Sequence, residues 1–277
     1  MTAYPAWLAS PLAVVMLVFF AAPIGMLAVV SLYGDAAMTQ WGSGSQWLKV
    51  LDPFGLGVLA DTLWLGAQVT LLSLVLGYAL AWVFIRLPAR VQPLVIFIVM
   101  LPLLTSVVVR TFAWIVILGR QGIVNGLLMD LGWIDAPLKL LYTRGGLVVV
   151  LANVQLPLMV FPLINALQKI DPNLADASAS LGGSDWQTFR KVTLPLSLPG
   201  IVAGSLLTFS AAITAFISQS LIGGGQMLFM PMYLYQQASA LSNYPFAAAI
   251  ALTFLGTVIV CVALFNRIGR AARVPAS

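Results

Sequence analysis

The feature that most constrains this chain is a run of 75 residues, Val192 to Asn266, without a single charged side chain. Shorter uncharged runs cover residues 1–34, Thr62–Ile85, Pro93–Val109 and Gly145–Gln168. An apolar helix of about 20 residues crosses the hydrocarbon core of a bilayer, which is about 30 Å thick. The runs therefore predict an all-α membrane protein that crosses the bilayer several times.

Composition excludes a soluble domain. Of the 277 residues, 61% are hydrophobic and 8% are charged, and the mean hydropathy is +1.02. A soluble globular domain carries about 25% charged residues, roughly three times as many. The chain is long enough for a sizeable core, but it has too few polar residues to cover the surface of a soluble protein.

Several residue types that would carry chemistry are missing. The sequence has no His and no Glu, its eight acids are all Asp, and Cys261 is the only cysteine. No intrachain disulfide or thiolate cluster can form, and the usual zinc and di-iron ligand sets cannot be built, so we expect no metal site. No phosphate-binding loop of the G-x-x-x-x-G-K-[ST] type occurs, so we expect no ATP on this chain. The net charge of +5 does not predict a nucleic-acid partner, because the basic residues flank apolar segments.

We predict six transmembrane helices. The long final run is broken by Gly223–Gly225 and Asn243–Pro245, which separates a fifth span from a sixth. No basic residue precedes the first run, so it is expected to be an uncleaved helix and not a signal peptide. The expected spans are Trp7–Leu32, Thr62–Ile85, Pro93–Val109 with or without a continuation to Leu118, Gly145–Gln168, Pro199–Ile222 and Pro245–Phe265.

The distribution of basic residues predicts the orientation. With six spans and both termini inside, the inner segments hold eight Lys and Arg and the outer segments hold five. Lys and Arg are enriched in cytoplasmic loops. Both termini are therefore predicted to lie in the cytoplasm.

The inner loop between the fourth and fifth spans is the segment most distinct from the rest. Residues 169–191 hold six of the 21 charged residues, three of each sign. Asp171 is a candidate N-cap for a first short helix, Gly182-Gly183 would end it, and Ser184 with Gln187 predicts a capping box for a second. Leu194-Pro195 and the prolines beyond are expected to turn the chain back into the membrane. Helices this short are unstable alone in water, so the loop is expected to dock onto another protein.

The loop also carries a recognisable signature. Asp176-Ala177-Ser178-Ala179-Ser180-Leu181-Gly182, followed after nine residues by Val192-Thr193-Leu194-Pro195, resembles the "EAA" signature of ABC-importer permease subunits. The signature reads E-A-A, three residues, G, nine residues, I-x-L-P. The spacing agrees at every anchor, while Asp176, Ser178 and Val192 depart from the usual Glu, Ala and Ile. The resemblance covers about residues 8–268.

The resemblance implies a type I ABC importer permease architecture, with residues 1–277 forming one transmembrane domain and residues 169–198 a cytoplasmic coupling loop. It implies that this loop contacts a cytoplasmic ATPase dimer, that ATP and Mg bind to the ATPase subunits, and that a periplasmic solute-binding protein delivers the solute. It implies residence in the bacterial inner membrane, a role in transport and not in catalysis, and alternating access as the mechanism. The expected ATPase-coupling residues are Asp171, Leu174, Asp176, Ala177, Leu181, Gly182, Val192, Leu194 and Pro195.

A second resemblance points to a subgroup. Arg110-Thr111-Phe112-Ala113-Trp114 and Gly119-Arg120-Gln121-Gly122-Ile123-Val124-Asn125 are similar to a stretch of spermidine/putrescine permeases. Similar motifs occur in permeases for aminoethylphosphonate, opines and iron, so those solutes remain alternatives to a polyamine. The subgroup implies a second, paralogous permease subunit as the partner in a heterodimer.

Polar residues within the apolar runs are candidates for the translocation pathway. Ser210, Thr214 and Ser218 recur every four residues, which places them on one face of the expected fifth helix. The alternative is that these small hydroxyls help helices to pack. Arg110, followed one turn later by Trp114, either lies at the outer interface or takes part in an outer gate. The predicted spans hold no carboxylate, so recognition of a polyamine is expected in the separate binding protein.

Other classes agree less well with the sequence. An intramembrane hydrolase needs a Ser/His, Ser/Lys or paired Asp site inside the spans, and an ion-driven transporter usually has ionisable residues at mid-membrane. Neither is present in the predicted spans. A non-transporting membrane scaffold remains the alternative outside transport, although it would not need the 176–195 signature.

Overall fold

The computed structural model describes residues 10–271 of the chain, and every regular element in that range is helical. The chain divides into two compact units. One consists of Met1–Ala60 with Met232–Ile259, and the other of Asp61–Pro231 with Val260–Ser277. The single domain over residues 1–277 stays a prediction.

The first unit contains short helices and parts of two long ones. Its complete elements are α1 (Ser10–Val30), α2 (Ser45–Val50) and the π-helix η3 (Gln236–Ala240). It also takes the start of α3 (Pro53–Phe84), most of α12 (Met230–Tyr235) and the first part of α13 (Tyr244–Ala271). Within it, the ring of Tyr233 makes edge-to-face contacts with Phe54 and Phe246, at centroid distances of 5.6 and 5.7 Å.

The second unit holds the remaining helices and carries the candidate site. Besides the rest of α3 and the end of α13, it comprises α4 (Gln92–Leu104), α5 (Val107–Leu118), α6 (Ile123–Asp130), α7 (Arg144–Gln168), α8 (Asn173–Ser180), α9 (Asp185–Thr188), the π-helix η2 (Phe189–Thr193), α10 (Leu194–Ile213) and α11 (Phe216–Gly223).

The predicted class of an all-helical membrane protein is confirmed. Five helical stretches in the described residues are long and apolar enough to cross a bilayer: Pro53–Phe84, Val107–Asp130, Arg144–Gln168, Asp185–Ile213 and Tyr244–Arg267. Two shorter apolar helices cover Val14–Val30 and Gln92–Leu104. Length and composition alone do not reproduce the count of six. The first predicted span begins at Trp7, and residues 1–9 lie outside the described range.

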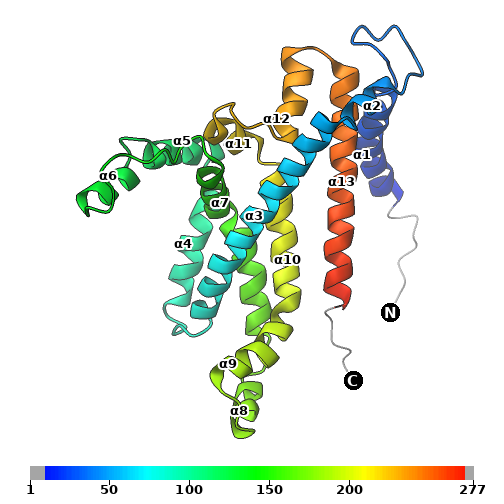
Figure 1. Cartoon of the computed structure of the whole chain (residues 1–277). Helices are drawn as coiled ribbons and strands as arrows, with labels where there is room; N and C mark the ends of the chain where they lie inside the picture. The colour runs from blue at the N-terminus through cyan, green and yellow to red at the C-terminus, as the bar shows by residue number, and fades with distance from the viewer. Residues whose placement is uncertain (1–9, 272–277) are drawn as a thin grey trace. The chain divides into compact units, whose positions relative to one another are not determined.

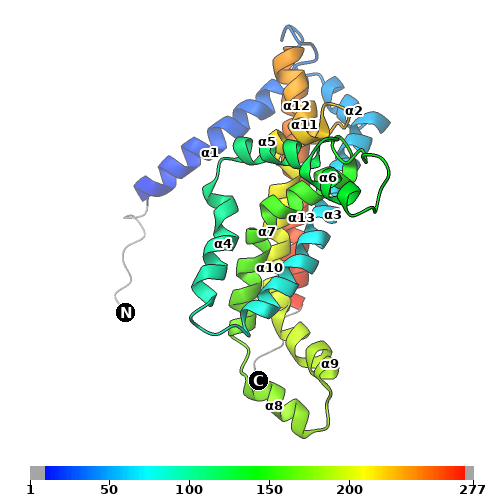
Figure 2. The same ribbon diagram turned by 90° about the vertical axis from the view of Figure 1, so that its left-hand side faces the viewer.

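Helices α7 and α10 form the centre of the second unit, and they run side by side in both views (Figures 1 and 2). Gly200 and Gly204 of α10 are both buried and lie against α7. A Cβ atom on Gly200 would come within 2.5 Å of Ala166 Cβ, and one on Gly204 within 2.8 Å of Met159 Sδ. The Gly-x-x-x-Gly spacing therefore allows the two backbones to approach closely, as it does in membrane helices generally.

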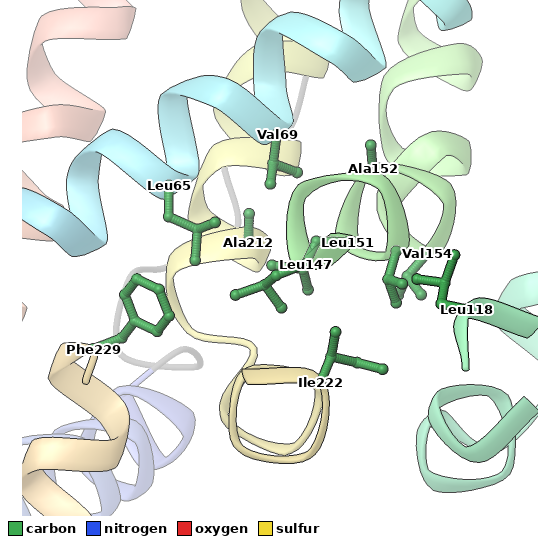
Figure 3. Packing of buried hydrophobic residues seen from close by; sticks show 11 residues of the cluster. Leu65, Val69, Leu118, Leu147, Leu151, Ala152, Val154, Ala212, Ile222 and Phe229 are labelled. Atoms are coloured by element: carbon green, nitrogen blue, oxygen red, sulfur yellow. The ribbon is translucent and has the colours of Figure 1, made fainter. Parts of the chain in front are cut away.

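Two apolar clusters hold α3 and α7 to their neighbours. Figure 3 shows the first, in which Leu65 of α3, Leu147 of α7, Ala212 of α10 and Ile222 of α11 converge. The second cluster joins the other end of α3 to α4 and α7, with Phe84 among its fully buried members. Each buried large apolar side chain contributes about 1.5–3 kcal/mol relative to exposure to water.

The third predicted span is not one helix. Helix α4 ends at Leu104 and α5 begins at Val107, with the extended residue Thr105 between them. Helix α4 runs along α7, whereas α5 and α6 turn across its end (Figures 1 and 2). The expected continuation to Leu118 is therefore wrong, because Pro102 removes a backbone donor near the end of α4 and the chain changes direction there.

The fifth predicted span has different limits. Its helix starts at Leu194 and ends at Ile213, and α11 begins only at Phe216. Pro195 and Pro199 both lie inside the continuous helical stretch Asp185–Ile213, where each removes one backbone donor without ending the helix. The prolines therefore do not turn the chain as expected. The break places Ser218 on α11, so Ser210, Thr214 and Ser218 do not share one helix face.

Candidate functional site: a helical elbow and a cavity at two helix breaks

Helices α8 and α9 form a helical elbow, residues 171–193, at one end of α7 and α10. Figures 1 and 2 place it at the end opposite to α5, α6 and α11. The elbow exposes large apolar side chains: Leu181 is 90% exposed, Trp186 67% and Leu174 42%. An exposed apolar group on a segment that also carries charges is typical of a docking surface.

The first helix of the elbow ends in a complete Schellman motif. Gly182 has φ +78°, its backbone N–H donates to the Ala179 carbonyl, and the N–H of Gly183 donates to the Ser178 carbonyl at 2.9 Å. Gly182 is needed for its backbone conformation, because a Cβ atom there would meet nothing within 4 Å. At Gly183 the reason is space, because a Cβ atom would lie 2.6 Å from Ser178 Oγ. The predicted helix end is confirmed.

The start of this helix differs by one residue from the expectation. Helix α8 begins at Asn173, and its N-cap position is occupied by Pro172 and not by Asp171. The Asp171 carboxylate still accepts a hydrogen bond from the backbone N–H of Asn173 at 2.9 Å. Asp171 thus satisfies one of the free donors of the first turn from one position farther out.

The second helix of the elbow, α9, leads directly into α10. The capping box is present: Ser184 Oγ accepts from the N–H of Gln187, and Gln187 Oε1 accepts from the N–H of Ser184. Helix α9 then continues through η2 directly into α10 as one stretch from Asp185 to Ile213. The expected second short helix is therefore not separate from the fifth span, so a displacement of α9 also displaces α10.

Most of the predicted coupling residues lie around one hollow. A cavity of about 400 Å³ is lined by Leu174, Ala177, Leu181, Gly182 and Val192, among others. Asp176 lies on the exposed surface of α8, and Asp171 borders a neighbouring cavity of about 380 Å³. Leu194 and Pro195 form the first turn of α10. Their role in coupling remains a prediction.

A separate cavity lies where α4, α5, α10 and α11 begin or end. Its volume is about 490 Å³, and Arg110, Gln155, Thr214 and Ser218 are among its lining residues. Three of the predicted pathway residues are thus brought together by two helix breaks that the sequence pattern did not show. The other two are not in this lining: Trp114 packs against the first apolar cluster, and Ser210 lies one turn before the end of α10.

Arg110 bridges the break between α4 and α5. The guanidinium Nη1 donates to the backbone carbonyl of Pro102, which lies inside α4 two residues before its end. The buried Nε atom has no hydrogen-bond partner in the described structure. The side chain therefore brings a cation into the cavity wall.

Sequence reasoning missed three buried polar contacts near this cavity. Ser218 Oγ and Thr111 Oγ1 lie 3.2 Å apart and join α11 to α5. Gln219 Nε2 donates to the carbonyls of Ala212 and Ile213, which are left free where α10 ends. The signal for Gln219 was an amide in an otherwise apolar run, but its partner depends on the position of the break.

Asn125 organises the hairpin between α5 and α7. Its Nδ2 donates to the carbonyls of Gly119 and Leu138, both at 3.0 Å, and its Oδ1 accepts from the N–H of Leu138 at 2.9 Å. The residue is fully buried. Both donors of this amide and one of its two acceptor lone pairs are thus used by backbone groups.

Helix α3 extends beyond the predicted span Thr62–Ile85 and so carries an acidic residue that lies outside that span. Helix α3 begins at Pro53, so it includes Asp61, whose carboxylate lies 3.0 Å from Arg144 Nη1 of α7. Arg144 also donates from Nε to Gln68 Oε1 at 2.9 Å. Among the described residues no three metal-ligating side chains come together.

Comparison with known proteins agrees with this geometry. Residues 73–273 match the family described as "Binding-protein-dependent transport system inner membrane component". The chain is 35% identical over 205 residues to the spermidine/putrescine transport system permease protein PotB of Escherichia coli strain K12, covering 74% of each protein. It is 34% identical over 232 residues to the inner membrane ABC transporter permease protein YdcU of the same strain, covering 79% of this chain and 74% of YdcU.

The fold is also that of solved importers. A chain from a bacterial ABC transporter that imports the acidic polysaccharide alginate superposes with a TM-score of 0.78 at 18% identity, over 96% of both chains. A second structure of an alginate transporter, in complex with a substrate-bound periplasmic protein, gives a TM-score of 0.76 at 18% identity, over 96% of this chain and 95% of that one. The family match, the sequence identity and the shared fold agree with one another. This multi-pass inner membrane chain belongs to the family of ABC importer permeases, which are transport subunits and not enzymes.

Proposed function

We propose that this permease imports a polyamine as one of two non-identical membrane subunits, and that its elbow is the point of contact with the ATPase. The observation that carries the coupling role is the exposed apolar elbow, above all Leu181, which is 90% exposed at the end of the α7–α10 pair. ATP and Mg bind to the ATPase dimer in this scheme. Closure of that dimer moves α9, and α10 follows because the two are continuous.

The test of the coupling role uses the backbone of the elbow. Gly182→Val places a β-branched side chain at φ +78°, which costs about 1–2 kcal/mol in backbone strain. Asp176→Lys reverses an exposed charge on α8. Both variants are expected to insert normally, to lose solute uptake and to bind the ATPase more weakly.

Two control variants separate coupling from folding. Gly182→Asn keeps a residue that tolerates the left-handed conformation and should retain more uptake than Gly182→Val. Gly132→Val introduces the same kind of strain at φ +68°, in open space between α6 and α7, and should leave ATPase binding unchanged. Near-normal uptake by Gly182→Val and Asp176→Lys at normal membrane abundance would refute the coupling role.

The polyamine assignment is supported by the similarity to the PotB proteins, which are spermidine/putrescine permeases. The cavity at the helix breaks has one cation and no carboxylate among its lining residues, so it does not itself form a strong dication site. We propose that a periplasmic binding protein recognises the amines and that the cavity, through Arg110, Thr214 and Ser218, forms part of the pathway. Uptake of labelled spermidine by proteoliposomes tests this, with aminoethylphosphonate, an opine and ferric iron as the competing solutes.

The orientation and assembly each have a direct test. Single cysteines at Ser184 and Ser45, in a Cys261→Ala background, should label from opposite sides of the membrane, with Ser184 accessible only from the cytoplasm.

Each chain has one elbow and an ATPase dimer presents two equivalent surfaces, so a second permease subunit is required. Native mass spectrometry is expected to show a paralogous partner. A stable homodimer that stimulates the ATPase would contradict the heterodimer.

A further inference from the structure

An aromatic cluster lies between the elbow and α3. The ring of Phe189, the first residue of η2, makes edge-to-face contacts with Trp82 and Tyr78 at centroid distances of 5.4 and 5.8 Å. The ring of Trp186 of α9 stacks with that of Phe189 at a centroid distance of 5.4 Å. Trp82 and Tyr78 are one turn apart on α3, so both present their rings to the elbow.

Hydrogen bonds connect this cluster to α8 and to α10. Ser178 Oγ of α8 lies 2.7 Å from Thr188 Oγ1, the residue directly before Phe189. Ser178 is one of the positions where this sequence departs from the importer signature, which has Ala there. On the far side of the cluster, the hydroxyl of Tyr78 lies 3.1 Å from Ser197 Oγ, which is buried in the second turn of α10.

The surroundings of the cluster are open. A groove of about 790 Å³ is lined by Tyr78, Trp82, Arg86 and Phe189 together with residues of α8 and α9. Close packing in a protein interior leaves few voids larger than a water molecule. The elbow is therefore not packed tightly against α3 along its length, and the rings bridge the groove.

The backbone at Phe189 is unusual as well. Residues Phe189–Thr193 form a single π-helical turn between α9 and α10. Such turns inside α-helices occur frequently at functional sites. The residue whose side chain contacts α3 is thus the first residue of the π-helical turn that joins α9 to α10.

We propose that Phe189 is a positioning residue that transmits the displacement of the elbow to α3, independently of docking the ATPase. This inference rests on the coupling role proposed above. A force on α8 reaches Thr188 through Ser178, and Phe189 then acts on Trp82 and Tyr78. Helix α3 is fixed to α7 by both apolar clusters, so its displacement moves the core of the second unit.

The test uses the complete transporter, with the ATPase, the partner permease and the binding protein loaded with spermidine or with whichever tested solute is taken up. Phe189→Leu and Trp82→Leu keep an apolar, though smaller, side chain and remove the ring contact. Phe97→Leu, on an exposed position of α4, is the matched control. Three quantities are measured for each variant: the affinity for the ATPase, the stimulation of ATP hydrolysis by the loaded binding protein, and the solute transported per ATP hydrolysed.

For Phe189→Leu we expect ATPase affinity within about twofold of wild type, and stimulation and transport per ATP reduced by about tenfold, within the range of coupling free energies between sites. The double variant Phe189→Leu/Trp82→Leu should lose little more than either single variant, because contacting residues are not additive. The proposal would be overturned by wild-type stimulation and transport per ATP in Phe189→Leu, or by losses in the double variant that equal the sum of the single losses. It would also be overturned if ATPase affinity fell in parallel with the stimulation. Failure of the coupling role itself would be seen separately, as unchanged ATPase binding in Gly182→Val.

Discussion

The close approach of α7 and α10 gives a prediction whose size follows from the structure. In Gly200→Ala the new Cβ atom would lie 2.5 Å from Ala166 Cβ and 2.7 Å from the Pro162 carbonyl oxygen. An ordinary contact is at least 3.4 Å, so α10 must move away from α7 locally by about 0.9 Å. A gap of that size removes about a quarter to a half of the dispersion energy of the atoms facing it.

The expected cost follows from two opposing terms. Overpacking a well-packed interface costs about 1–3 kcal/mol. Replacing Gly by Ala inside a helix contributes about 0.5–1 kcal/mol in the opposite direction. We therefore expect Gly200→Ala to lower the free energy of unfolding by about 1–2 kcal/mol. We expect a smaller decrease for Gly204→Ala, because its Cβ atom would lie 2.8 Å from the flexible Met159 side chain and 3.0 Å from the nearest backbone atom, the Met159 carbonyl oxygen.

The measurement is the free energy of unfolding of the purified chain in mixed micelles, titrated with a denaturing detergent. Gly256→Ala on α13 is the control, because a Cβ atom there would meet nothing within 4 Å. It should be neutral or stabilising by up to about 1 kcal/mol. If Gly200→Ala were as stable as Gly256→Ala, the two helices would not be held in close contact by the absence of side chains.

Two further predictions concern the loops. The Asp35 carboxylate accepts hydrogen bonds from the N–H of Gln40 and from Thr39, and these bonds lower its pKa below the ordinary 3.8. The ionised carboxylate therefore stabilises this loop above that pH, and the stabilisation is lost as the pH falls through the lowered pKa. Hydrogen exchange at the Gln40 amide, compared with the Asp35→Asn variant, should show protection only on the high-pH side. Asn125→Leu removes three hydrogen bonds to backbone groups and leaves the N–H of Leu138 without its acceptor, so it should destabilise the α5–α7 hairpin by about 1–3 kcal/mol. Limited proteolysis that is no faster than in wild type would contradict this.

Local chemistry made parts of the elbow predictable from sequence. The capping box at Ser184 and Gln187 and the left-handed Gly182 follow from rules that involve only neighbouring residues. The membrane class follows from uncharged runs, because a bilayer excludes charge regardless of how the helices pack. The signature around Asp176 and Gly182 predicted the family, which the comparisons confirm.

The helix breaks depended on tertiary structure. Ser210, Thr214 and Ser218 have the spacing of a helix face, yet the chain breaks at Thr214 because Gln219 satisfies the free carbonyls at the end of α10. The partner lies only six or seven residues farther along the chain, but the contact forms only where the helix ends, so the four-residue spacing of the hydroxyls does not predict it. The meeting of Arg110 with Ser218 in one cavity has the same origin.

The sequence by itself therefore determined where apolar segments lie, which short segment stays outside them, and how that segment is capped, because these depend on solvent and on nearest neighbours. Tertiary structure alone decided that Phe189 reaches Trp82 of α3 and that two interrupted helices surround one cavity. The physical reason is that contacts between residues about 100 positions apart depend on how whole helices pack, and helix packing is set by summed small contacts that no single stretch of sequence contains.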